Sequence, residues 1–248
     1  MPAALPNRIS PGLLYRGGDP RQRLIVALDV STAAAAQRIV AAVGDSALTY
    51  KVGMQLYTAE GPQLVRDLIA SGRRVFLDLK YHDIPNTVAG AVTEAAKLGV
   101  SMLTVHAAGS GKMLHAAVEA AAARPGLMVL AVTVLTSLDS YDLDRIGIRG
   151  SVEDTVVRLA TIALANGCHG VVTSAREAST LRAELGSQFA IVTPGVRPAG
   201  SSVGDQVRTV TPAEAIAAGA SHIVVGRPIT DASDPAAEAR AILGQISG

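Results

Sequence analysis

The chain has 248 residues, of which 49% are hydrophobic, 17% are charged and 3% are aromatic, and its formal net charge at pH 7 is +1. This balance supports a large apolar core and excludes a disordered chain, and it lacks the basic surface and stacking aromatics of a nucleic-acid-binding protein. No apolar run reaches the roughly 18 residues of a membrane span, the N-terminus lacks the apolar segment of a signal peptide, and Cys168 stands alone. We therefore expect a cytoplasmic protein without disulfides.

Short β-branched segments alternate with Ala-rich segments of helical period along the whole chain. The predicted strands are 24–29, 49–53, 74–80, 102–106, 127–135, 170–174, 189–193 and 222–226. The predicted helices lie near 31–43, 60–71, 86–98, 111–123, 151–166, 175–185, 212–218 and 235–246. This alternation predicts an α/β fold with a parallel sheet that helices cover.

The number of repeats favours a single (β/α)8 TIM barrel over residues 22–248, preceded by an N-terminal extension, 1–21. An open, doubly wound sheet is the alternative. Two features favour the closed barrel: no Gly-x-Gly-x-x-Gly follows the first predicted strand, and polar residues stand at the C-terminal ends of nearly all strands. These are Asp29, Lys51, Asp78 with Lys80, His106, Thr136, Ser174, Arg197 and Arg227. In a barrel these ends meet at one mouth, where active sites of this fold lie.

The segment D-L-K-Y-H-D at 78–83 closes the third predicted strand. Because side chains alternate along a strand, Asp78 and Lys80 are expected to point the same way. His82 and Asp83 follow as the chain leaves the strand, and Pro85 suits the first turn of a helix. One interpretation is a structural ion pair with Asp83 as helix cap. The other is a reactive centre, because a lysine between two acids in a partly dry mouth is typical of catalytic sites.

Two further charges precede this segment. Asp29 is followed by Ser31 and Thr32, so it can belong to a helix-capping turn. Lys51 lies within the apolar strand Y-K-V-G, where a buried ammonium requires a partner. Asp29 and Asp78, on the two neighbouring strands, are the expected partners.

Glycine and arginine recur after the last two predicted strands, in T-P-G-V-R-P at 193–198 and V-V-G-R-P at 224–228. Loops at these places in TIM barrels often bind phosphate through backbone N–H groups, and Arg227 would add a bidentate guanidinium. The small polar stretch 199–206 suits a closing lid. A plain surface loop with exposed arginines is the alternative.

Other motifs are excluded by their spacing. The sequence G-S-G-K at 109–112 lacks the remaining P-loop residues and is interpreted as a helix-start turn. The five histidines show no H-x-H or H-x-x-x-H pattern, and no G-x-S-x-G is present. We therefore predict no metal site and no serine-hydrolase elbow.

The ten residues D-L-K-Y-H-D-I-P-N-T at 78–87 closely resemble the signature of the orotidine 5'-phosphate decarboxylase family. Companion motifs follow in the family's order over about residues 22–246: A-L-D at 27–29, K-V-G at 51–53, T-V-H-A at 104–107, V-T-V-L-T-S at 132–137, T-P-G-V-R at 193–197 and V-V-G-R-P at 224–228. The chain resembles the short bacterial form. The resemblance implies decarboxylation of orotidine 5'-phosphate (OMP) to uridine 5'-phosphate (UMP), in pyrimidine biosynthesis, without metal or organic cofactor.

The same resemblance implies a role for each matching residue. Lys80 is implied to be the proton donor to the carbon that loses carbon dioxide, and Asp78 to lie against the departing carboxylate. The other implied sites are the ribose contacts Asp29 and Lys51, the base contact Thr136, and the lid and phosphate residues Arg197, Gln206, Gly226 and Arg227. Asp83, Ile84 and Thr87 are implied to reach the neighbouring subunit's site, so a homodimer with shared sites is expected.

Two rival functions remain at this stage. A related barrel, a metal-assisted sugar-phosphate decarboxylase or aldol-type synthase, shares the acid-x-Lys-x-x-acid core but lacks I-P-N-T after it. A non-catalytic phosphate-ligand-binding protein would have no need of Lys80 or Asp83. A magnesium requirement distinguishes the first rival, and binding without turnover distinguishes the second.

Overall fold

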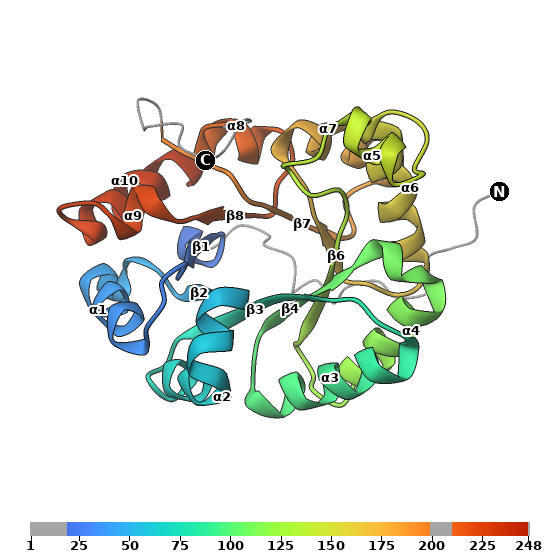
Figure 1. Cartoon of the computed structure of the whole chain (residues 1–248). Helices are drawn as coiled ribbons and strands as arrows, with labels where there is room; N and C mark the ends of the chain where they lie inside the picture. Colours follow the sequence, from blue (N-terminus) through green and yellow to red (C-terminus); the bar gives the residue numbers. More distant parts are fainter. Residues whose placement is uncertain (1–18, 199–209, 248) are drawn as a thin grey trace.

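Eight parallel strands form a closed barrel in chain order, with β8 pairing to β1 (Figure 1). The computed structural model describes residues 19–198 and 210–247. Its strands are β1 (Leu24–Ala27), β2 (Thr49–Gly53), β3 (Arg74–Tyr81), β4 (Met102–His106), β5 (Met128–Val132), β6 (Gly170–Val172), β7 (Ala190–Thr193) and β8 (His222–Val225). Every predicted strand is present, the TIM-barrel prediction is confirmed, and the open-sheet alternative is wrong.

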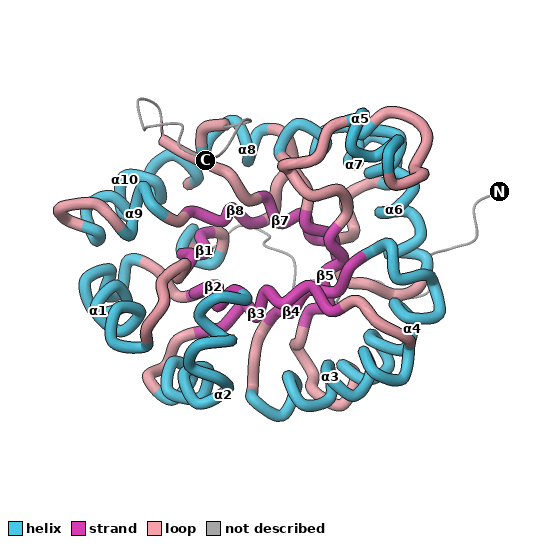
Figure 2. The backbone as a smooth tube through the Cα atoms, viewed as in Figure 1, coloured by secondary structure: helices cyan, strands magenta, loops and turns pink. Residues whose placement is uncertain are grey.

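The helices form an outer layer around the strands (Figure 2). They are α1 (Ala33–Val43), α2 (Met54–Ala70), α3 (Pro85–Leu98), α4 (Ser110–Ala121), α5 (Ser140–Arg145), α6 (Val152–Ala165), α7 (Ala175–Leu185), α8 (Pro212–Ala217), α9 (Arg227–Thr230) and α10 (Pro235–Ile246). Short 3-10 turns lie at η1 (Pro20–Gln22), η2 (Gly44–Ser46) and η3 (Ala107–Gly109). Among these described helices, none is long and apolar enough to cross a membrane.

The structure adds helical segments that the sequence analysis did not predict. Helix α2 begins at Met54, directly after β2, and its first segment was not predicted. Gly61, with φ of 68°, interrupts the helix before Pro62, so that a second segment starts there, close to the predicted start near 60. The sequence analysis missed α5 and α9, which have six and four residues and are too short to show a helical period.

The apolar core occupies the barrel interior and the layer between strands and helices. Strands β1, β5 and β8 are buried along their whole length, as predicted for parallel strands covered on both faces. Cys168 belongs to this core, and burial raises the pKa of its thiol to about 12. It therefore packs as a small apolar side chain. The proposed boundary at residue 21 falls inside η1, and the division of the chain there stays a prediction.

Candidate active site

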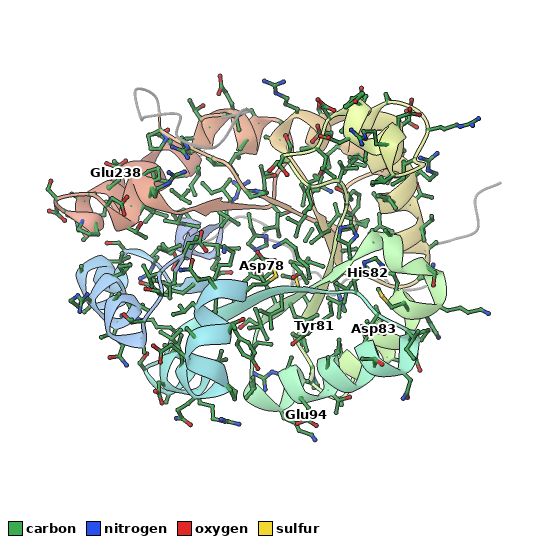
Figure 3. All side chains as sticks on the ribbon, viewed as in Figure 1. Asp78, Tyr81, His82, Asp83, Glu94 and Glu238 are labelled. Atoms are coloured by element: carbon green, nitrogen blue, oxygen red, sulfur yellow. The ribbon has the colours of Figure 1, made fainter. Side chains whose placement is uncertain are left out.

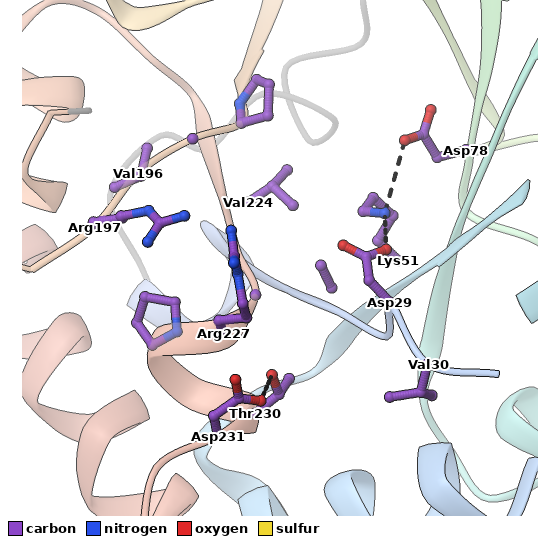
Figure 4. A pocket seen from close by; sticks show the side chains of 15 residues that line it. Asp29, Val30, Lys51, Asp78, Val196, Arg197, Val224, Arg227, Thr230 and Asp231 are labelled. Atoms are coloured by element: carbon purple, nitrogen blue, oxygen red, sulfur yellow. Dashed lines mark hydrogen bonds and ion pairs between the residues drawn. The ribbon is translucent and has the colours of Figure 1, made fainter. Parts of the chain in front are cut away.

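Two adjoining cavities open at the C-terminal ends of the strands. The larger, of about 530 Å³, is lined from β1, β2, β3 and the segments after β7 and β8, and includes Asp29 and Lys51 (Figure 4). The smaller, of about 180 Å³, includes Lys80 and Thr136 and is otherwise mostly apolar. The cavities share four lining residues: Lys51, Asp78, Pro194 and Val224. A ligand with a polar and a less polar part could therefore span both.

A row of alternating charges runs along the boundary between the cavities. Lys51 Nζ lies 2.7 Å from Asp29 Oδ1 and 3.9 Å from Asp78 Oδ2. Lys80 Nζ donates a hydrogen bond of 2.9 Å to Asp78 Oδ1. The side chains of Lys51 and Asp78 are only 12% and 14% exposed, so these charges act in a partly dehydrated environment. The partners predicted for Lys51 are therefore the ones it has.

The strand register places this row. Ala27 pairs with Lys51 across β1 and β2, and Gly53 pairs with Asp78 across β2 and β3, so the row follows neighbouring strands around the mouth. Gly53 leaves the space that the Lys51 ammonium occupies, because an added methyl group there would lie 3.1 Å from Nζ. Thr32, rather than Asp29, caps α1, so the capping interpretation of Asp29 is wrong.

One polar residue beside the row was missed by the sequence analysis. Thr104, on β4, is fully buried, and its hydroxyl accepts from Lys80 N at 2.9 Å and donates to Asp78 Oδ1 at 3.0 Å. In the sequence it looks like one more β-branched residue of a buried strand. Two signals could have found it: its spacing of two from His106, which puts both side chains on one face of the strand, and its place at the start of the T-V-H-A motif.

The two histidines beside Lys80 contact each other. The rings of His82 and His106 stack with centroids 5.2 Å apart and an interplanar angle of 17°. His106 Nδ1 accepts from Ala108 N at 3.3 Å. Burial, then the charges of His82 and Lys80, lower the pKa of His106, which favours its neutral form. His106 thus packs against the ring of His82.

Two arginines line the far side of the larger cavity. Figure 4 shows Arg197 and Arg227 beside one another, opposite the Asp29 and Lys51 pair. Burial, and then the charge of Arg227, lower the pKa of Arg197. Two guanidiniums held together next to Gly195 and Gly226 make a place suited to a multiply charged anion. Gln206 and the predicted lid, 199–206, lie outside the described residues.

Three predicted site residues lie away from both cavities within one chain. Asp83 is well separated from Asp78 in Figure 3, and its Oδ1 accepts from Ile84 N at 2.6 Å. Ile84 is 66% exposed and Thr87 is also exposed. Helix α3 has no side-chain cap, so the interpretation of Asp83 as a helix cap is wrong. Within the described residues, no group of three or more His, Cys, Asp or Glu is placed to hold a metal ion.

Comparison with known proteins shows which protein family this barrel belongs to. The model of the family "Orotidine 5'-phosphate decarboxylase / HUMPS family" matches residues 22–242. The chain belongs to this family. The chain is 54% identical over 223 residues to the orotidine 5'-phosphate decarboxylase of Anaeromyxobacter dehalogenans, and the match covers 90% of this chain and 97% of the relative. For the Halorhodospira halophila decarboxylase the identity is 54% over 226 residues, covering 91% and 96%.

A solved structure of the family has the same fold. The crystal structure of orotidine 5'-phosphate decarboxylase from Lactobacillus acidophilus superposes with a TM-score of 0.81 at 38% identity, covering 91% of this chain and 99% of that one. The resemblance inferred from residues 78–87 and their companion motifs is therefore confirmed for the family and for the barrel.

Proposed function

We propose that the two cavities bind orotidine 5'-phosphate and that the charged row between them performs its decarboxylation. Conversion of OMP to UMP in pyrimidine biosynthesis, a carboxy-lyase reaction, is the activity of this chain, in keeping with its family and with relatives at 54% identity. The single observation that carries the assignment of the site is the row Asp29, Lys51, Asp78, Lys80 at the junction of a polar and a largely apolar cavity.

The substrate lies across the junction. Its phosphate binds Arg197 and Arg227, near Gly226, and Gln206 from the lid completes this end. The ribose hydroxyls contact Asp29 and Lys51, which already lie 2.7 Å apart. The base enters the smaller cavity, whose lining includes Thr136. This orientation places the carboxylate of the base against Asp78, beside the ammonium of Lys80.

The reaction breaks the bond between the ring carbon and its carboxylate, and the electron pair remains on the carbon. Such a vinyl-type carbanion has no neighbouring carbonyl to delocalise it, so the uncatalysed barrier is high. Enzymes reach accelerations of about 10^17-fold, equivalent to about 23 kcal/mol. A single charge pair 4 Å apart contributes only about 4 kcal/mol at an effective dielectric constant of about 20, so several positioned charges must act together.

Lys80 has two roles in this scheme. Its ammonium stabilises the developing carbanion, and Nζ then donates its proton to the same carbon to give UMP. Asp78 holds Lys80 at 2.9 Å and disfavours the substrate carboxylate beside it. The phosphate of the substrate binds far from the reacting carbon, and its binding energy holds the substrate carboxylate beside Asp78 and Lys80. The chain requires no metal and no organic cofactor for these steps.

The site is completed by a second copy of the chain. In a homodimer, Asp83, Ile84 and Thr87 reach the partner's cavity, and Asp83 adds a second carboxylate beside Lys80. Two large apolar side chains support this arrangement. Met54, directly after the end of β2, and Ile84, three residues after the end of β3, are 55% and 66% exposed in the single chain. We place the dimer in the cytoplasm, with a small nucleotide as its ligand and neither nucleic acid nor membrane as partner.

The decisive experiment incubates the purified protein with orotidine 5'-phosphate and a chelator, and follows the loss of the substrate's ultraviolet absorbance. We expect full turnover with chelator, and less than about a hundredth of it for Lys80→Ala, the scale of a lost acid catalyst. Lys97→Ala, which removes an exposed lysine of α3, is the matched control and keeps wild-type turnover. Dependence on magnesium would favour the sugar-phosphate rival, and binding without product would favour the non-catalytic one.

A further inference from the structure

The catalytic end of β3 departs from regular strand pairing. From Leu77 to Tyr81, β3 advances four residues, whereas its partner β4 advances two, from Leu103 to Val105. Asp78 and Lys80 both lie in this irregular interval. Lys80 has φ of 51°, in the left-handed region that non-glycine residues avoid. Something must therefore hold the backbone at Lys80 in an unfavourable conformation.

Thr104 is the β4 residue within this interval, and its hydroxyl supplies a hydrogen-bond acceptor for the Lys80 N–H in place of a backbone carbonyl of the regular ladder. Oγ1 accepts from the backbone N–H of Lys80 at 2.9 Å and donates to Asp78 Oδ1 at 3.0 Å. A hydroxyl carries one donor and accepts through its lone pairs, so one side chain makes both bonds at once. The side chain is fully buried and β-branched, which restricts its rotation about χ1.

The bond to Asp78 also sets the direction of its carboxylate. Oδ1 receives Thr104 Oγ1 at 3.0 Å and Lys80 Nζ at 2.9 Å, while Oδ2 faces Lys51 Nζ at 3.9 Å. Each oxygen therefore faces its own lysine. A quarter turn of the carboxylate would move each of its oxygens away from the lysine that it faces.

We propose that Thr104 is a positioning residue for the decarboxylation, whose hydroxyl holds the Lys80 backbone and the Asp78 carboxylate in the geometry that directs the Lys80 ammonium. The kinetic part of this inference rests on the proposed function. Thr104 lines neither cavity, so it acts through Asp78 and Lys80 rather than on the substrate. Its loss should therefore lower kcat and leave binding at the phosphate end, around Arg227, nearly unchanged.

The test compares Thr104→Val, which keeps the shape and removes the hydroxyl, with Thr104→Ser, which keeps the hydroxyl. For Thr104→Val we expect kcat to fall by about 10- to 100-fold, with KM and the affinity for UMP within about threefold of wild type. For Thr104→Ser we expect kcat within about threefold of wild type. A thermal melt of each variant identifies one that has failed to fold.

A second measurement does not depend on turnover. Hydrogen exchange at the Lys80 amide should be at least about tenfold faster in Thr104→Val than in wild type, because its acceptor is gone, and close to wild type in Thr104→Ser. The inference is overturned if folded Thr104→Val keeps kcat within about threefold, or if its Lys80 amide is as protected as in wild type. It is also overturned if the serine variant is as impaired as the valine variant. An inactive wild-type enzyme would refute the proposed function instead, and the exchange result would still decide whether Thr104 holds the Lys80 backbone.

Discussion

His222 should make the protein lose stability as the pH falls below about 6.5. This histidine begins β8, is 4% exposed, and its Nδ1 has no hydrogen-bond partner among the described residues. Burial, followed by the nearby charges of Arg74 and Arg23, lowers the pKa of His222 from 6.5 to about 4. The folded protein therefore holds His222 neutral at a pH where the unfolded chain would bind a proton.

The sign and size follow from that difference. Because the pKa is lower in the folded state, the contribution is fully present above pH 6.5 and is lost as the pH falls towards 4. The lowering of the His222 pKa from 6.5 to about 4 corresponds to about 3 kcal/mol of stability at full protonation, of which about 2 kcal/mol is already lost at pH 5.

The assay is urea unfolding of wild type and His222→Gln at pH 7.5 and pH 5, at one protein concentration, since the stability of the proposed dimer would depend on that concentration. The free energy of unfolding of the wild type should fall by about 2 kcal/mol more than that of His222→Gln over this interval. His115→Gln, which removes an exposed imidazole from α4, controls for the loss of a histidine as such. Equal pH dependence in wild type and His222→Gln, within about 0.5 kcal/mol, would refute the reasoning.

Two further results are expected. Gly170→Ala should destabilise the barrel by about 2 kcal/mol or more in urea unfolding, because its new Cβ would lie 2.2 Å from the Ala190 carbonyl oxygen. The control is Gly244→Ala, whose Cβ would meet no atom within 4 Å and which should not lower the free energy of unfolding. A Gly170→Ala protein as stable as wild type would contradict this prediction. For the shared site, mixing inactive Lys80→Ala and Asp83→Ala subunits should restore about a quarter of wild-type turnover, because half of the dimers then carry one intact site; no recovery after subunit exchange would show that Asp83 acts within its own chain.

The sequence by itself determined the architecture and the location of most of the proposed site residues. Eight apolar strands with eight helical segments require a covered parallel sheet, and strand alternation with polar strand ends places Asp29, Lys51, Asp78 and Lys80 at one mouth. These inferences depend on the spacing of apolar and polar residues within single strands and helices, which can be read from short stretches of the sequence. The same locality hid α5 and α9, which are too short to repeat, and the short first segment of α2 that precedes the kink at Gly61 and Pro62.

Only the tertiary structure decided how these residues are arranged relative to one another. The irregular β3 register and the left-handed backbone at Lys80 depend on a partner strand more than twenty residues along the chain, and sequence spacing contains no sign of them. Asp83 and Asp78 are only five positions apart in the sequence, yet they lie well apart in the structure, because β3 ends between them and the chain turns outward. Thr104 is the clearest case: its side chain is ordinary for a buried strand, and contact with β3 gives it two specific hydrogen bonds.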